Sequence, residues 1–342
     1  MIKKKAVKIC VAAATAALVT AVVLLGVFLP VKGQANDSEY WSEYDEFKIN
    51  DIPVIETGED GFTVLQLTDL HYHLPHMTKN TDSIIKKLVS ENNPDFIVIT
   101  GDTVYGPTNL MYTKHVAELM DGFEIPWAIV YGNHDDEGKA DKYRMGEIYE
   151  NSEYCVYENG PFNIGGTGNY AVNLTKNGLP FYSLIMMDSN RVTRYAGKEE
   201  YGSFTPSQVI WYDWLQQGLT DNGYDKSMMF FHIPFPEYIE AYEYWEESGF
   251  DPSTGSGSKN EDVCCSTYNP GMFGKILEKG ATTHVFVGHD HVNDYSVNYK
   301  GITLTYGVKS SRQFYFDEQL LGGTVIKISP DAEVTVERAY VS

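Results

Sequence analysis

Basic residues and cysteines are scarce in this chain of 342 residues, and both shortages exclude classes of function. The 26 Lys and Arg stand against 47 Asp and Glu, which gives a formal net charge of −21. This balance disfavours nucleic-acid binding, because such binding depends on basic side chains that displace counterions from phosphates. The four cysteines contain no C-x-x-C pair, which excludes zinc-finger and thioredoxin-like sites.

Long-range regularity is missing as well. The sequence has no heptad pattern and no internal repeat of about 20–50 residues, so a coiled coil and a solenoid are excluded. Its 43% apolar and 13% aromatic residues suffice for a sizeable core, which excludes a disordered or collagen-like chain. A globular protein remains, either an enzyme or a binding module.

An apolar segment opens the chain. Lysines at positions 3, 4, 5 and 8 precede an uncharged apolar run from Ile9 to Pro30. This pattern is typical of a secretory signal or of an N-terminal membrane anchor. The length of the run favours an anchor, whereas Gly33-Gln34-Ala35 would serve as a cleavage site. We therefore expect residues 1–35 to direct export, with the remaining chain anchored at the outer face of the cell membrane or secreted.

One domain is expected to follow. Residues 36–60 are polar and acidic, and we interpret them as a tether to a domain over residues 61–342. Apolar runs at 62–68, 96–100 and 127–131 alternate with helical patterns at 78–92 and 109–122, which predicts βαβαβ with a parallel sheet. Further strand patterns lie near 170–174, 181–187, 228–232 and 285–287, and a helical pattern covers 205–218. The predicted fold class is α/β.

Metal-binding residue types follow five of these strand patterns, and five of the nine histidines are among them. The five motif blocks are Asp69-Leu-His71, Gly101-Asp102, Gly132-Asn133-His134-Asp135, His232 and Gly288-His289-Asp290-His291. In an open α/β sheet, ligands gather beyond the carboxyl ends of the strands. We therefore expect the five blocks to meet at one site.

The donor atoms of these blocks indicate two metal ions. Seven side chains offer oxygen or imidazole donors: Asp69, Asp102, Asn133, His71, His232, His289 and His291. Seven donors are too many for one tetrahedral zinc, and they suit two cations such as Fe, Mn or Zn that share a carboxylate. Such a pair activates a water and neutralises charge on a transferring phosphoryl group. His134 then remains uncoordinated and able to protonate the leaving oxygen as a general acid.

The series D-x-H, G-D, G-N-H-D, H and G-H-x-H resembles the calcineurin-like metallophosphoesterases over about residues 62–310. Stretches such as Tyr201-Gly202 and His232-Ile-Pro-Phe-Pro-Glu237 are similar to the subgroup related to purple acid phosphatases. The resemblance implies a calcineurin-like phosphoesterase β-sandwich core flanked by helices. It also implies one metal held by Asp69, His71, Asp102 and His291, and another held by Asp102, Asn133, His232 and His289.

One position departs from the subgroup. Purple acid phosphatases have D-x-G in the first block and a ligand tyrosine in G-D-x-x-Y. This chain has both His71, in place of that glycine, and Tyr105 in Gly101-Asp-Thr-Val-Tyr105. The two side chains compete for one coordination position, and His71 completes D-x-H. We therefore expect His71 to be the ligand and Tyr105 to line the pocket, without the purple colour.

Several weaker features are left open. His73, Tyr105 and Arg312 are candidate substrate contacts, and Asp135 would either orient a histidine or cap a helix. The glutamate-rich segment 237–247 is either a solvated helix face or a lid over the site. The three cysteines beyond the apolar run, Cys155, Cys264 and Cys265, are either all free or joined by one bridge that involves the adjacent pair, and we expect the bridge.

The sequence therefore predicts an exported, metal-dependent hydrolase of phosphomonoesters or phosphodiesters. Its partner would be a small phosphorylated molecule rather than a nucleic acid, with membrane attachment if the N-terminal segment stays uncleaved. A nucleotidase or cyclic-nucleotide phosphodiesterase is the narrower alternative. From a different class, a catalytically silent surface-binding module would be expected to lack a ligand or His134, and this chain lacks neither.

Overall fold

The computed structural model describes residues 40–341. The predicted signal or anchor over residues 1–35 thus lies outside the described residues. Among the helices of the described part, none combines the length and the apolar character that a membrane crossing requires.

The smaller of two main sheets contains the predicted βαβαβ unit. Its strands, in sheet order, are β15 (Val334–Tyr340), β14 (Gly322–Ile328), β2 (Phe62–Leu67), β3 (Phe96–Thr100) and β4 (Trp127–Val130). β2, β3 and β4 run parallel, as predicted, and the antiparallel β14 pairs with β2. The crossovers are the helices α2 (Pro75–Asn92) and α3 (Asn109–Asp121). Every residue of β3 and β4 is buried, which explains why these strands read as continuous apolar runs.

The larger sheet has eight strands of mixed direction. In sheet order they are β1 (Val54–Glu56), β5 (Tyr170–Lys176), β6 (Leu179–Met186), β9 (Ser227–Phe230), β11 (Thr282–Val287), β13 (Ile302–Tyr306), β12 (Ser296–Tyr299) and β10 (Gly255–Ser256). A separate hairpin is formed by β7 (Val192–Tyr195) and β8 (Lys198–Tyr201). The helix α4 (Lys142–Glu150) packs against α3, and the helices beside the larger sheet are α5 (Pro206–Asp221), α6 (Glu237–Glu247) and α7 (Met272–Lys279).

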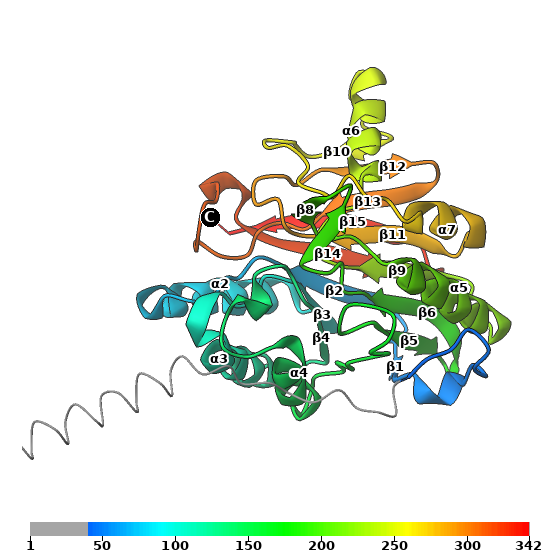
Figure 1. Cartoon of the computed structure of the whole chain (residues 1–342), viewed down its shortest axis with the longest axis horizontal. Helices are drawn as coiled ribbons and strands as arrows, with labels where there is room; N and C mark the ends of the chain where they lie inside the picture. The colour runs from blue at the N-terminus through cyan, green and yellow to red at the C-terminus, as the bar shows by residue number, and fades with distance from the viewer. Residues whose placement is uncertain (1–39, 342) are drawn as a thin grey trace, which may run out of the picture.

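Two hydrophobic cores make the molecule a layered sandwich (Figure 1). The inner core joins the two sheets, since it contains Leu67 and Ile99 of the smaller sheet together with Leu184 and Phe230 of the larger one. It also includes the apolar faces of α2 and α3. The outer core packs α5, α6 and α7 on the other face of the larger sheet. The predicted α/β sandwich flanked by helices is confirmed.

The helix predicted to begin after Thr205 does so for the expected reason. Thr205 caps α5, because its hydroxyl accepts from the backbone N–H of Gln208 at 3.1 Å. The Gln208 carbonyl oxygen in turn accepts from the Thr205 N–H at 2.9 Å, which completes a capping box.

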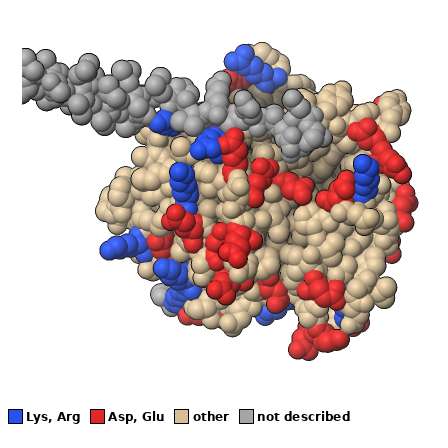
Figure 2. All heavy atoms as spheres, turned by 90° about the horizontal axis from the view of Figure 1, so that it is seen from below, with Lys and Arg blue, Asp and Glu red and all other residues tan. Residues whose placement is uncertain are grey.

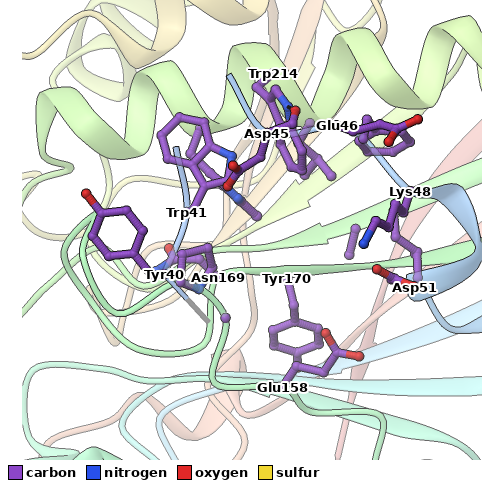
Figure 3. Close-up of a pocket in the computed structure, with 17 residues that line it drawn as sticks. Tyr40, Trp41, Asp45, Glu46, Lys48, Asp51, Glu158, Asn169, Tyr170 and Trp214 are labelled. Atoms are coloured by element: carbon purple, nitrogen blue, oxygen red, sulfur yellow. Dashed lines mark hydrogen bonds between the residues drawn. The ribbon is translucent and has the colours of Figure 1, made fainter. Parts of the chain in front are cut away.

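The N-terminal part of the described chain is packed rather than free. β1 pairs in parallel with β5. The rings of Trp41 and Phe47 lie edge-on against Trp214 of α5, with centroid distances of 5.8 and 5.2 Å. Of the segment interpreted as a tether, residues 36–60, the structure describes residues 40–60, and these aromatic side chains hold that polar part against the domain. Between this segment and α5 lies a cavity of about 560 Å³ (Figure 3), and its lining contains none of the predicted site residues.

The glutamate-rich segment forms α6 and is not a lid. Tyr238, Ala241 and Trp245 are buried in the outer core, and the helix packs against β12. Four of its glutamates are exposed, namely Glu240, Glu243, Glu246 and Glu247. The segment is thus a helix with one solvated face, the first of the two alternatives.

All three cysteines of the described part are free thiols, so the expected bridge is wrong. Cys155 lies beside β4 of the smaller sheet, in a backbone bridge with Trp127. Cys264 lies elsewhere, where its backbone N–H donates to the Asp290 carboxylate that follows β11. Their different positions in the fold keep Cys155 away from the adjacent pair.

Candidate metal centre

The structure brings the five motif blocks together beyond the carboxyl ends of β2, β3, β4, β9 and β11. Three groups of side chains each place their ligand atoms within 4.8 Å of one another. The groups are Asp69, His71 and His291; His71, Asp102 and His134; and Asp102, His232 and His289. The groups share members, so they form one continuous cluster. All but His134 are buried.

Sharp backbone turns at the strand ends direct these side chains inward. Asp69, His71, Asp102 and His289 all adopt a positive φ, between 48° and 78°, which residues with a side chain rarely adopt. Two backbone bonds join the first two blocks, from Asp69 N–H to the Gly101 carbonyl and from His71 N–H to the Asp102 carbonyl. Such concentrated backbone strain is typical of functional sites.

Glycine is required where the blocks approach each other. A Cβ atom on Gly101 would lie 2.5 Å from the His232 ring. A Cβ atom on Gly132 would lie 2.2 Å from a carboxylate oxygen of Asp102. The glycines of the second and third blocks therefore allow one side chain of the cluster to sit directly against a neighbouring backbone.

Asp102 occupies the centre of the cluster. Its Oδ2 atom lies 3.2 Å from Nε2 of His71 on one side and 3.2 Å from Nε2 of His232 on the other. Its Oδ1 atom accepts the backbone N–H of His134 at 2.8 Å. One carboxylate thus faces donor atoms of both halves of the cluster.

Two histidines have their outer ring nitrogen fixed by the backbone. Nδ1 of His232 lies 2.8 Å from the Thr100 carbonyl, and Nδ1 of His291 lies 3.0 Å from the Tyr315 carbonyl. A carbonyl can only accept, so Nδ1 carries a proton and Nε2 is the nitrogen left to bind a cation. Both Nε2 atoms face carboxylates of the cluster, which is the orientation that metal-binding histidines adopt.

Several buried polar atoms of the cluster have no hydrogen-bond partner. They are Oδ1 of Asp69, Oδ1 of Asn133, Nε2 of His232 and Nε2 of His289. An unsatisfied buried polar atom costs about 1–3 kcal/mol, so four in one cluster need a reason. Cations bound among these atoms would satisfy them, and the mixture of carboxylate, amide and imidazole donors suits Fe, Mn or Zn. The residues therefore fit a pair of metal ions.

The charges of the cluster are strongly coupled. Burial alone would raise the pKa of Asp102, but the neighbouring His232 and His71 outweigh it and lower this pKa well below its usual value. Burial would lower the pKa of His232, yet Asp102 raises it to about 9. Burial, together with the charge of His232, lowers the pKa of His289 to about 3. One carboxylate and one imidazole thus balance each other, while His289 stays neutral and available as a ligand.

Lys309 is a buried member of the site that the sequence analysis missed. Its ammonium donates to the Asp69 carbonyl at 2.8 Å and lies 3.3 Å from Nδ1 of His71. Burial lowers its pKa to about 8. Lys309 follows β13, which runs parallel to β11. The rule that located the five blocks would have found it, had the strand at 302–306 been recognised as a member of the parallel part of the sheet.

His134 lies at the open side of the cluster, with its side chain 33% exposed. Its Nδ1 atom is 3.0 Å from Oε2 of Glu137, and Arg191 contacts the other oxygen of Glu137 at 3.2 Å. The carboxylate of Asp135 has a role other than the two expected of it, which were to orient a histidine or to cap a helix. This carboxylate accepts the N–H groups of Val104 and Gly132, so it ties the segment after the second block to the third block.

The candidate substrate contacts divide into two kinds. His73 and Tyr105 lie at the cluster, since the Tyr105 ring is 5.2 Å from the His134 ring and 5.4 Å from the His73 ring. Arg312 has its guanidinium engaged by Glu318, with Nε donating at 3.0 Å. The structure therefore brings His73 and Tyr105 to the site but directs the charge of Arg312 to a neighbouring carboxylate.

The chain is similar in sequence to known proteins of one family. The calcineurin-like phosphoesterase family matches residues 62–293. The chain is 30% identical over 292 residues to "Probable inactive purple acid phosphatase 14" of Arabidopsis thaliana, a match that covers 72% of this chain and 70% of the relative. It is 28% identical over 277 residues to "Phosphatase DCR2" of Saccharomyces cerevisiae, with 70% of this chain and 46% of the relative covered.

Among solved structures, a dimetal phosphatase from Danio rerio aligns with 82% of this chain and 100% of its own, at 13% identity and a TM-score of 0.49. The family match spans well over half of the chain and includes all five motif blocks. The chain therefore belongs to the calcineurin-like phosphoesterase family.

Proposed function

We propose that this protein is an exported dimetal hydrolase of phosphomonoesters or phosphodiesters. The central observation is the position of Asp102, whose Oδ2 atom lies 3.2 Å from an imidazole nitrogen on each side. In the proposed assignment, Asp102 is shared by both metals. Asp69, His71 and His291 complete one set of ligands, and Asn133, His232 and His289 complete the other.

Hydrolysis by such a site needs little covalent participation by the protein. When bound, the two cations would supply an activated water and neutralise phosphoryl charge. The water oxygen becomes bonded to phosphorus, and the bond from phosphorus to the alcohol oxygen breaks. In the proposal, His134 gives its proton to that leaving oxygen and regains one from the water. Glu137, 3.0 Å from Nδ1, holds the His134 ring in place.

The name of the Arabidopsis relative raises the alternative of a silent protein, since it reads "Probable inactive". We favour activity because all seven donors and His134 are present, and six of the donors lie with His134 in one cluster, while Asn133 directly precedes His134. A binding module derived from an enzyme has no need to keep four buried ligand atoms without hydrogen-bond partners.

The distribution of charge supports a small substrate rather than a nucleic acid. Acidic side chains cover more of the face shown in Figure 2 than basic ones do, in keeping with the net charge of −21. A polyanion lying across such a surface would be repelled.

The proposed function is tested by metal analysis together with a panel of phosphomonoesters and phosphodiesters, including nucleotides and cyclic nucleotides. We expect two metal ions per chain, hydrolysis of at least one ester class, loss of activity on chelation and recovery on adding metal. A protein with two bound metals that cleaves no ester would support the silent module. Preference for nucleotides would support the narrower alternative.

His71 and Tyr105 give separate predictions for the first metal. If His71 is the ligand, His71→Ala loses one metal ion, while Tyr105→Phe keeps both and the protein stays colourless. The reason is that His71 shares a group of ligand atoms with Asp69 and His291, whereas the contacts of Tyr105 are ring contacts. Elemental analysis and a visible spectrum measure both. A charge-transfer band that vanishes in Tyr105→Phe would reverse the assignment.

Export is part of the proposal and rests on the lysines and the apolar run before residue 35. Protease added to intact cells should digest the domain if it lies outside the membrane. Complete protection that ends only on lysis would contradict export.

A further inference from the structure

An exposed phenylalanine in a strained conformation lies over the metal centre. Phe314 has a φ of +59°, in the left-handed region, and its side chain is 41% exposed. Both features are unfavourable for a bulky apolar residue, the first sterically and the second through hydration. A strained residue at a site is a reason to look for a functional role.

The ring of Phe314 contacts the open side of the cluster. Its centroid lies 4.7 Å from that of His71, 4.8 Å from that of Tyr105 and 5.0 Å from that of His73. It also lies nearly parallel to the ring of His134, with 12° between the planes and 6.2 Å between the centroids. An aromatic face thus stands next to the proposed proton donor.

Two further exposed rings lie on histidines of the cluster. Tyr315, which is 54% exposed, stacks on His291 at 4.2 Å. Tyr201, which is 45% exposed, lies edge-on to His289 at 4.7 Å. The entrance to the metal centre is therefore bordered by aromatic side chains from distant parts of the sequence.

The charges around the entrance disfavour a second anionic group on the substrate. Beside His134 lies a cavity of about 410 Å³ whose lining includes Glu137, Glu199 and Glu200. Arg191 also lines it, but this arginine already contacts Asp136 and Glu137. The rings in this lining are those of His134 and Tyr201, and a second phosphate or a carboxylate in the cavity would meet carboxylates.

We propose that Phe314 is a specificity-determining residue that stacks against the leaving group, and that the preferred substrates are phosphate esters of aromatic alcohols without a second anionic group. The inference rests on the proposed function, because the leaving oxygen must lie near His134. The ring attached to that oxygen then comes within reach of the neighbouring Phe314 face. Tyr315 and Tyr201 complete the aromatic border.

The test compares 2-naphthyl phosphate with glycerol 2-phosphate in the full-length protein. An aromatic contact contributes beyond area burial, so we expect the ratio of kcat/KM for the naphthyl ester over the glycerol ester to fall about 2–13-fold in Phe314→Ala. The fall should come mainly from KM. Phe314→Tyr should restore the ratio. Phe314→Gly, which removes the ring and also relieves the backbone, should lower it as Phe314→Ala does.

Phe250 provides a matched control. It also has a φ of +59° and is 45% exposed, but it packs against Tyr242 and Trp245 of α6. Phe250→Ala should leave the ratio unchanged. An unchanged ratio in Phe314→Ala overturns the inference, as does a gain on both esters, which would make the ring an obstruction. A wild-type protein that cleaves neither ester, nor any other phosphoester, would refute the proposed function itself.

Discussion

Replacing Asp102 by Asn is expected to remove both metal ions and nearly all activity. The substituted amide keeps the shape of the side chain but loses its charge and one of its two acceptor oxygens. In the wild type, a single oxygen of Asp102 lies 3.2 Å from His71 and 3.2 Å from His232. Residues that only orient a metal ligand contribute about 10–100-fold to affinity or activity. The shared carboxylate should contribute more than this.

The measurements for Asp102→Asn are the metal content and kcat/KM on an activated aryl phosphate. Asp213→Asn is a suitable control, because Asp213 lies on α5 and pairs with Lys275 and Lys279. That variant should keep both metals and full activity. An Asp102→Asn protein with two metals and normal kcat/KM would show that the metal centre has been misassigned.

The position of the cluster could be predicted because a simple rule of sheet topology places its residues together. Parallel strands end at one edge of a sheet, so short motifs that directly follow such strands must meet there. The blocks that contain Asp69, Asp102 and Asn133 follow β2, β3 and β4, which pair in parallel. No pairing of distant segments had to be guessed for these three blocks.

Residues outside the blocks could not be predicted because their positions depend on tertiary packing. Glu137 reaches His134 only because residues 135–137 form a single 3₁₀ turn, which has no periodic signal in the sequence. Phe314 reaches the cluster through an irregular segment and a positive φ that apolar residues rarely adopt. Patterns of hydrophobicity carry no information on either.

The fold likewise has parts that local sequence patterns predict and parts that depend on tertiary packing. The βαβαβ unit follows from periodicity alone, whereas the pairing of β14 with β2 joins segments more than 250 residues apart and no local pattern indicates it. The two-sheet arrangement was expected only from the family resemblance. In residues 40–60, the acidic composition gave no sign that Trp41 and Phe47 attach the segment to α5.

His134→Ala should lower kcat while leaving both metal ions bound. His134 lies near His71 and Asp102 at the exposed side of the cluster but belongs to neither proposed set of ligands, so we expect its loss to remove a proton donor only. General-acid catalysis contributes about 10²–10⁴-fold, and we expect a loss of this size for an ester with a poor leaving group. For a good leaving group, which departs without a proton, the loss should be much smaller. An equal loss on both esters would contradict the acid role.

Glu137 extends this prediction, since it should act only through His134. Its carboxylate lies 3.0 Å from Nδ1 of His134 and is held on its other oxygen by Arg191. Glu137→Gln should therefore lower kcat in the wild-type background and change nothing further in a His134→Ala background. Independent losses that multiply in the double variant would mean that Glu137 acts on the substrate or the metals directly. Non-additivity, measured with the poor leaving group, is the result that places both residues on one proton path.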